Sequence, residues 1–108
     1  MPVPFLTTEQ RVNALAKATA IRQGRAALRK QLADGSCTLE DVFAKSDAGD
    51  AVAAGMPIFE VVRALPGYGD VKTGSVLDVC KVSHKRRVRG VGVRQRARLL
   101  EELRRRRR

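Results

Sequence analysis

The sequence predicts an all-α fold. Alanine, leucine and arginine, which favour helices, are abundant, and no segment shows the strict alternation of a half-buried strand. Apolar residues instead recur at intervals of three and four, as one face of a helix requires. A chain of 108 residues suits one compact domain with an extended arm. Because aromatic residues are scarce and tryptophan is absent, the core is expected to be aliphatic.

A short arm and a long basic helix are expected at the N-terminus. Two prolines oppose helix formation in residues 1–7, which are predicted to be extended. The helix is predicted over residues 8–34. The spacing of Thr7 and Gln10 is that of a capping box, and Asp34-Gly35-Ser36 ends the helix. Its apolar side is expected to contain Ala14, Ala18, Ile21, Leu28 and Leu32, and its basic stripe contains Arg22, Arg25 and Arg29.

A compact helical region is predicted over residues 35–103. A first short helix is expected to end near Ala48, and a brief turn then leads to Gly55. Pro57 suits the first position of the next helix, where its missing N–H has no consequence. The core residues expected in these two helices are Leu39, Val42 and Phe43, followed by Ile58, Val61, Val62 and Leu65.

Two more helices are expected, each after a Gly-x-Gly connector. The first follows Gly67–Gly69 and the second follows Gly90–Gly92. Gly74 weakens the first by roughly 1 kcal/mol relative to alanine, which favours a closely packed neighbour at that point. The residues expected to face the core are Val76, Val79 and Cys80 in the first, and Ala97, Leu99, Leu100 and Leu103 in the second.

The charge of the chain is unevenly distributed. The net charge is +11, and residues 81–108 hold 13 basic and two acidic residues. Residues 1–80 hold nine of each, with a basic segment over residues 8–32 and an acidic one over 33–80. A polyanionic partner is therefore expected, with nucleic acid favoured over a membrane.

Other features of the sequence limit the classes of function. Cys37 and Cys80 are too far apart for a metal motif, and with one histidine in the chain neither a metal nor another cofactor is expected. Cys80 is interpreted as a small apolar packing residue and Cys37 as part of a connector. We find no pattern of a signal peptide and no apolar run of membrane-spanning length, so a reducing cytoplasm is expected.

The two connectors raise the question of phosphate binding. Neither completes a dinucleotide fingerprint or a Walker loop. Glycines before a helix let the main chain approach a phosphate, toward which the N–H groups at the helix N-terminus point. The simpler interpretation is that glycines only permit left-handed turns.

The charges around the two connectors differ, and this difference makes the second connector the better candidate for phosphate binding. Around Gly90–Gly92 a phosphate would meet guanidinium groups together with main-chain donors. At Gly67–Gly69 the two interpretations remain balanced, because Asp70 would repel a phosphate. The basic residues around the second connector are Lys85, Arg86, Arg87, Arg89, Arg94, Arg96 and Arg98.

Several residues have a plain structural interpretation beside the functional one. His84 is interpreted as a solvated member of the basic turn, and Tyr68 as a cover for its loop. The stripe on the first helix is either a solvated face or a second DNA surface. Residues 104–108 are predicted to be a disordered polyarginine tail.

Three stretches of the sequence resemble a known family. They are "LTTEQRVNALAKATAIRQGRAALRKQL", "MPIFEVVRALPGYGDVKTGSVL" and "RRVRGVGVRQRARLLEEL", and the family is the actinobacterial, mycobacterial-type integration host factor family. The resemblance implies a helix-two-turns-helix module over about residues 58–103. It implies a nucleoid-associated, cytoplasmic protein, monomeric in isolation, that binds and bends duplex DNA with little sequence preference. Compaction of DNA and assistance to a phage integrase–DNA complex are also implied.

The resemblance implies two DNA-contacting segments. The first contains Pro66, Gly67, Gly69, Val71 and Lys72, and the second contains Arg86, Arg87, Arg89, Gly90 and Gly92, with Arg94 beside it. The chain departs from the family pattern at Asp70, where a basic residue is usual, and at Gly74, where alanine is usual. Its polyarginine end also differs from the neutral tail of the family.

Two other classes of function remain as alternatives. An RNA-binding or ribosome-associated protein could use the same helix-two-turns-helix framework. A fragment of a DNA glycosylase would require a catalytic acid and zinc-finger cysteines, which this sequence lacks. We therefore expect a protein that is not an enzyme.

Overall fold

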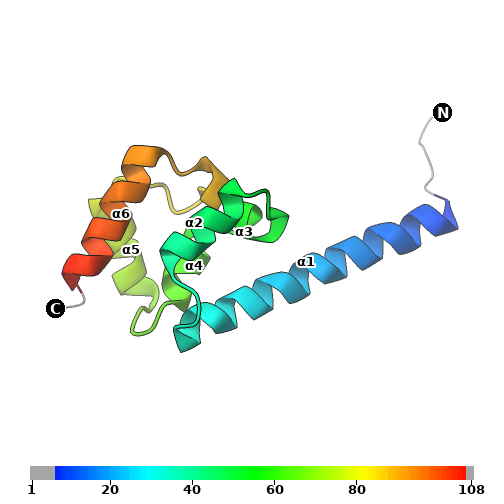
Figure 1. The fold of residues 1–108 in the computed structure, drawn as a ribbon, viewed down its shortest axis with the longest axis horizontal. Coiled ribbons are helices and arrows are strands. Elements are labelled where there is room, and N and C mark those ends of the chain that lie inside the picture. The colour runs from blue at the N-terminus through cyan, green and yellow to red at the C-terminus, as the bar shows by residue number, and fades with distance from the viewer. Residues whose placement is uncertain (1–6, 107–108) are drawn as a thin grey trace.

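The computed structural model describes residues 7–106 and confirms the all-α class within them (Figure 1). Residues 1–6 of the expected arm and residues 107–108 of the expected tail lie outside the described part. The helical elements are α1 (Thr8–Asp34), α2 (Leu39–Asp47), α3 (Ala51–Gly55), α4 (Ile58–Ala64), α5 (Asp70–Val79), the 3₁₀ helix η1 (Val88–Gly90) and α6 (Val93–Arg106).

Both ends of α1 are formed by the residues that the sequence indicates. The Thr7 hydroxyl accepts a hydrogen bond from the Gln10 amide at 3.1 Å, and the Gln10 side chain accepts one from the Thr7 amide. Gly35 ends the helix in the left-handed conformation with φ of 85°, which glycine adopts without strain. The predicted capping box and stop signal are therefore confirmed.

The apolar side of α1 is buried only at its C-terminal end. Leu28 and Leu32 are buried, whereas Ile21 is 38% exposed and Ala14 is also exposed. Figure 1 shows the reason, because the N-terminal part of α1 extends away from the other helices. The expectation that Ala14, Ala18 and Ile21 would pack with the core is wrong for Ala14 and Ile21, and Ala18 is only half-buried.

A short helix replaces the expected turn before Gly55. Residues 51–55 form α3, and the Asp50 carboxylate caps it by accepting hydrogen bonds from the Val52 and Ala53 amides. A helix of five residues is too brief to show a periodic apolar pattern, which is why it was not predicted. α2 ends at Asp47, close to the expected position, and begins with a second capping box between Thr38 and Asp41.

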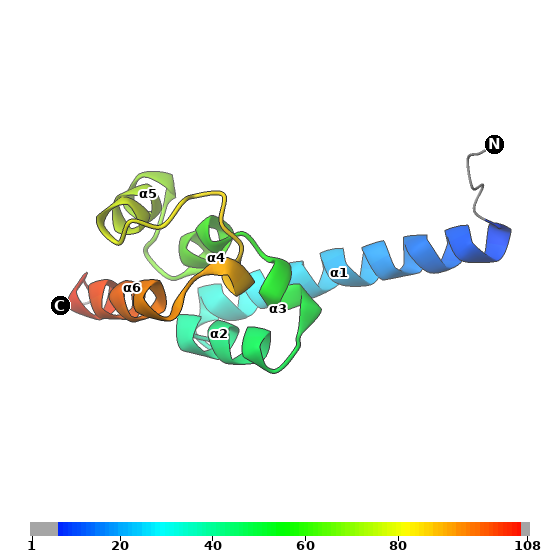
Figure 2. The same ribbon diagram turned by 90° about the horizontal axis from the view of Figure 1, so that it is seen from above.

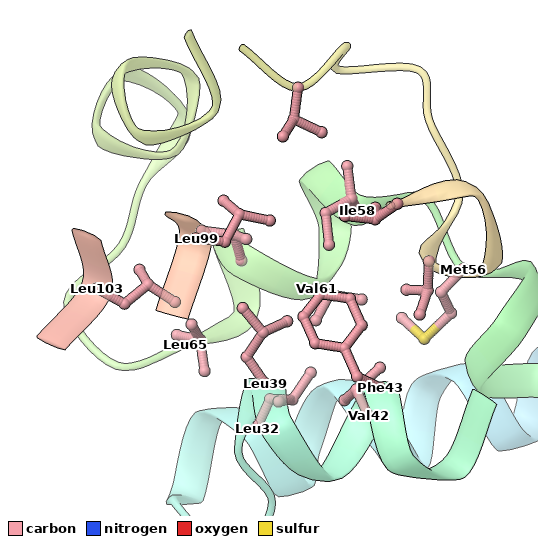
Figure 3. Close-up of a cluster of buried hydrophobic side chains, with 14 of the residues drawn as sticks. Leu32, Leu39, Val42, Phe43, Met56, Ile58, Val61, Leu65, Leu99 and Leu103 are labelled. Carbon is pink, nitrogen blue, oxygen red and sulfur yellow. The ribbon is translucent and has the colours of Figure 1, made fainter. Parts of the chain in front are cut away.

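The core is aliphatic, as the composition predicts, and it lies between the C-terminal part of α1 and helices α2 to α6 (Figures 2 and 3). Most expected core residues of α2 and α4 are fully or nearly fully buried. The residues labelled in Figure 3 are Leu32, Leu39, Val42, Phe43, Met56, Ile58, Val61, Leu65, Leu99 and Leu103.

Two residues expected to face the core are exposed instead. Val79 in α5 is 55% exposed, and Leu77 is buried in its place. α5 turns the face that contains Leu77 toward its neighbours α4 and α6. In α6, Ala97 is exposed and Leu100 is only partly buried, whereas Leu99 is fully buried. Three-to-four spacing predicts which residues share a buried face only to within about one residue. This explains why Val79 and Ala97 were wrongly expected to face the core.

The polyarginine end is helical as far as the structure describes it. Arg104–Arg106 continue α6, and their side chains contact Glu101 and Glu102. The Glu102 carboxylate is only 8% exposed and lies 2.6 Å from Nε of Arg106. Hydrogen bonds from Arg106 and then Arg105 lower the pKa of Glu102. The expected disordered tail is therefore wrong for Arg104–Arg106, because two glutamates stabilise the last turn.

The described part of the molecule is elongated. Its principal extents are 57 × 29 × 27 Å, and the long axis follows α1 (Figures 1 and 2). Among residues 7–106, we find no helix both long and apolar enough to cross a bilayer.

Candidate nucleic-acid interface

Residues 86–92, here called the 86–92 turn, are fixed by backbone hydrogen bonds to the start of α4. The Ile58 amide donates to the Arg86 carbonyl at 2.8 Å, and the Val88 amide donates to the Met56 carbonyl at 2.9 Å. The Val88 side chain is fully buried. This anchor holds the backbone in place while the flanking arginines remain exposed, namely Arg86, Arg87 and Arg89.

The main-chain amides of residues 90–92 are already bonded. The Gly90 amide donates to the Arg87 carbonyl at 2.8 Å, and the Val91 amide donates to the Val88 carbonyl at 3.1 Å. The Gly92 amide donates to Oε1 of Gln95 at 3.1 Å. The expectation that the Gly90–Gly92 amides stand ready for a phosphate is therefore wrong.

The neighbouring main-chain donors belong to α6. The Gly92 carbonyl accepts from the Arg96 amide at 2.8 Å, so Gly92 begins the helix. The first amides of a helix, here from Val93 onward, have no partner within it. They point out of the N-terminus beside the exposed Arg94, where a phosphate would meet a guanidinium group and the positive end of the helix dipole.

Gly90 is closely approached by the Arg86 side chain and is not in a left-handed conformation. Its φ is not positive, whereas that of Gly67 is 82°. A β-carbon at Gly90 would lie 3.3 Å from Cγ of Arg86, which is a tight contact. The Arg86 side chain crosses the turn at this point, and its Nη1 donates to the Gly90 carbonyl at 2.9 Å. The left-handed interpretation thus fits the first connector and not the second.

The basic residues of α6 have different surroundings. Arg96 donates to both carboxylate oxygens of Asp47, at 3.0 and 2.8 Å, and its guanidinium lies 4.8 Å from the centre of the Phe43 ring. Its Nε also donates to the Val91 carbonyl at 3.0 Å. Arg96 therefore joins α6 to α2, while Arg94 and Arg98 are exposed.

The first connector, residues 65–69, has its own basic group and its own ion pair. Lys72 lies with Nζ 4.9 Å from the centre of the Tyr68 ring. The Asp70 carboxylate is 2.5 Å from Nε of Arg63, which offsets the repulsion expected at this loop. Gly69 begins α5 without a side-chain cap, so the first amides of α5 are also unpaired within the helix. The other predicted contact residues, Pro66, Gly67 and Val71, are exposed, with Val71 at 88%.

The two predicted contact segments do not form one cluster. Pro66 and Tyr68 line a cavity of about 380 Å³ with Leu32 and Leu103, at the C-terminal ends of α1 and α6. The 86–92 turn lies near the other end of α6 (Figure 1). At 1.5 Å per residue, α6 separates them by roughly 15–20 Å, so one duplex would have to contact them at separate points on its backbone.

Two of the three arginines of the basic stripe on α1 contact other helices. Nη1 of Arg29 lies 3.9 Å from the Glu60 carboxylate, and Nη2 of Arg25 donates to the Gly55 carbonyl at 3.4 Å. Arg22 contacts the Thr19 hydroxyl at 3.3 Å and is exposed. Arg29 is exposed as well, so only Arg25, which is half-buried, departs from the expected solvated face.

Gly55 is the residue that sequence reasoning missed. Its carbonyl accepts hydrogen bonds from Arg25 of α1 and from Arg87 of the 86–92 turn. No local pattern could have indicated this convergence, since residues 25, 55 and 87 are distant in sequence. His84, expected to be solvated, is exposed, and its Nε2 lies 2.9 Å from Asp78. Cys80 is buried, in agreement with its predicted packing role, and Cys37, predicted only as part of a connector, is buried too.

The fold and these two helix-entry turns define a helix-two-turns-helix protein. Residues 32–103 match the family described as the S13-like H2TH domain. Proteins named Integration host factor from Mycolicibacterium smegmatis and Mycobacterium tuberculosis are 39% and 40% identical over 102 residues. Each match covers 94% of this chain and 96% of the relative. The chain belongs to the integration host factor family, as its resemblance predicted.

Two further matches agree with this assignment. The Streptomyces coelicolor protein named Integration host factor is 35% identical over 102 residues, 94% of each chain. The solved structure of sIHF bound to an 8bp palindromic DNA matches with a TM-score of 0.76 and 32% identity. That match covers 81% of this chain and 97% of the other.

Proposed function

We propose that this protein is a nucleoid-associated architectural protein that binds and bends duplex DNA with little sequence preference, compacts it and assists site-specific phage integration. The observation that carries the proposal is the exposed, arginine-rich 86–92 turn anchored on an H2TH framework. The likeness of the chain to sIHF, solved bound to an 8bp palindromic DNA, gives independent support.

In this proposal the binding is electrostatic and acts on the DNA backbone. Arg86, Arg87 and Arg89 contact phosphates at the turn, and Arg94 does so with the first amides of α6. Lys72 and the first amides of α5 contact the backbone at a second point. Contacts of this kind position a protein without reading base edges, which accounts for a low sequence preference. No enzymatic step, metal or cofactor is part of the proposal.

Salt dependence tests the electrostatic part. Because each neutralised phosphate releases counterions, log K should fall with log salt concentration with a slope of roughly −0.9 per phosphate. Random duplexes of equal length should bind with similar affinity. Fluorescence anisotropy over a series of NaCl concentrations measures both quantities, and an affinity that barely changes with salt would refute the proposal.

Substitution tests the assignment of the turn. Arg86→Ala and Arg87→Ala should each weaken binding and reduce bending of duplex DNA, measured by energy transfer between labelled DNA ends. Lys45→Ala on α2, which also removes one positive charge, is the matched control and should leave bending unchanged. Unchanged bending in both arginine variants would remove the 86–92 turn as the site.

The RNA-binding alternative is tested in the same system. Structured RNA should compete poorly with duplex DNA for the purified protein. Preferential binding of the RNA would replace this proposal with a ribosome-associated role.

A further inference from the structure

Three arginines from distant parts of the sequence meet at Gly55. Arg25 comes from α1, and Arg87 and Arg89 come from the 86–92 turn. The Gly55 carbonyl accepts from Nη2 of Arg25 and from Nη1 of Arg87. A β-carbon at Gly55 would meet only two groups within 4 Å, namely Nη2 of Arg25 at 3.6 Å and Nη1 of Arg89 at 3.8 Å. The three guanidinium groups therefore converge on one short stretch of backbone.

No carboxylate neutralises this cluster within residues 7–106. Elsewhere in the described chain, arginines packed against neighbouring elements pair with acids, as Arg29 does with Glu60 and Arg96 does with Asp47. Arg25, Arg87 and Arg89 form no such ion pair there. Like charges held close together repel, and one backbone carbonyl leaves most of their donors unused, since each guanidinium has five N–H groups.

One of the unused donors is buried. Nε of Arg25 is inaccessible to solvent and has no hydrogen-bond partner in the described structure. Buried donors in folded proteins are nearly always paired, so an unpaired one indicates a missing partner. A partner with several acceptor oxygens and negative charge would satisfy this donor and relieve the repulsion, and a phosphate group has both properties.

We propose that Arg25, Arg87 and Arg89 together bind a single phosphate of the DNA backbone, which joins α1 and the 86–92 turn into one continuous binding surface. The inference rests on the proposed function and extends it. It makes Arg25 a phosphate ligand and not a member of a separate second surface. DNA bound at this point holds α1 at a fixed angle to the helix-two-turns-helix module.

The test compares two variants of α1 that each remove one positive charge. Arg25→Gln removes the proposed ligand. Lys30→Gln is the matched control, since Lys30 is exposed and lies roughly 140° round the helix from Arg25. Binding of a short duplex is measured by fluorescence anisotropy over a series of NaCl concentrations, and thermal unfolding is measured without DNA.

Arg25→Gln should lower affinity roughly tenfold, since a charged hydrogen bond is lost. The salt slope should change little, because Arg87 and Arg89 still neutralise the same phosphate. Lys30→Gln should change neither quantity. A duplex with one neutral methylphosphonate at the contacted position should bind more weakly to the unaltered protein but no more weakly to Arg25→Gln. Should Arg25→Gln fail to fold, Arg25→Met keeps a helix-forming, unbranched side chain, and the same loss of affinity is expected.

Two results would overturn the inference, and they have different consequences for the proposed function. If Arg25→Gln lowers the unfolding temperature but binds the duplex as tightly as Lys30→Gln does, Arg25 only attaches α1 to α3. The proposed function would survive that result. If the unaltered protein binds duplex DNA without salt dependence, both the proposed function and this inference fail.

Discussion

Single arginines in this protein differ in function according to their surroundings. Arg96 is held by Asp47, the Val91 carbonyl and the Phe43 ring, so it stabilises the fold. Arg86 and Arg94 are exposed and form no ion pair within residues 7–106. Composition alone counts all of these as equal positive charges, and only the contacts distinguish the structural residues from those available to a polyanion.

Two glycines in helices should respond in opposite ways to the same substitution. Alanine should favour a helix by about 1 kcal/mol at either position. At Gly24 in α1, the new β-carbon would lie 2.9 Å from Cγ2 of Val52, a short β-branched side chain that cannot swing away. At Gly74 in α5, the nearest atom is Cε1 of His84 at 3.5 Å, an ordinary contact.

Urea denaturation should therefore show Gly24→Ala to be destabilised and Gly74→Ala to be stabilised by up to about 1 kcal/mol. Overpacking commonly costs about 1–3 kcal/mol, which outweighs the helix preference at Gly24. The double variant Gly24→Ala with Val52→Ala should relieve the clash and serves as the control. Equal shifts of the midpoint in both single variants would contradict this account.

At the scale of elements, the helices depend on local caps to different extents. α2 is bounded by a capping box and packs on both α3 and η1, so its cap contributes to the whole folded structure. α1 has an equivalent box at Thr7, but the helix near it lies outside the core, and Val12 and Leu15 are 58% and 66% exposed. Local unfolding at that end need not disturb the remaining helices.

Removing the two caps should separate global from local stability. Thr38→Ala should lower the free energy of unfolding by about 1 kcal/mol, a typical value for an N-cap. Thr7→Ala should leave the cooperative transition unchanged and should speed amide hydrogen exchange only in the first turns of α1. A loss of global stability in Thr7→Ala equal to that in Thr38→Ala would show that the whole of α1 unfolds with the core.

The whole molecule consists of a compact helical body and a projecting helix. Its radius of gyration is 16.3 Å, whereas a compact chain of this length would have about 13 Å. The difference arises because the residues at the start of α1 contact no other helix, and the body buries only Leu28 and Leu32 of its apolar side. In our further inference, DNA bound by Arg25, Arg87 and Arg89 fixes the angle of this projecting helix.

Small-angle X-ray scattering should detect this shape in solution. The measured radius of gyration should clearly exceed the value of about 13 Å for a compact chain, and the distance distribution should have a long tail. A helix-breaking variant, Ala18→Pro, should shorten that tail and leave the unfolding of the body nearly unchanged. A compact scattering profile for the unaltered protein would mean that α1 folds back in solution.

Much of the fold was predictable because its signals are local. Caps, stop signals and three-to-four spacing act within a few residues, so the bounds of α1 and the end of α2 followed from the sequence. α3 was missed because five residues carry no period, and Val79 was misplaced because a helix face depends on its neighbours. The helical Arg104–Arg106 also escaped prediction, since ion pairs with Glu101 and Glu102 outweighed the repulsion within the arginine run.

The sequence by itself determined the helical class, the family and the position of the basic segment along the chain, because charge and periodicity can be counted without knowing contacts. Only the tertiary structure decided which basic residues remain available. It engaged the Gly90–Gly92 amides within the turn, paired Asp70 with Arg63, and brought Arg25 beside Arg87 at Gly55. These outcomes depend on distances between residues far apart in sequence, which packing of the core sets and no local pattern encodes.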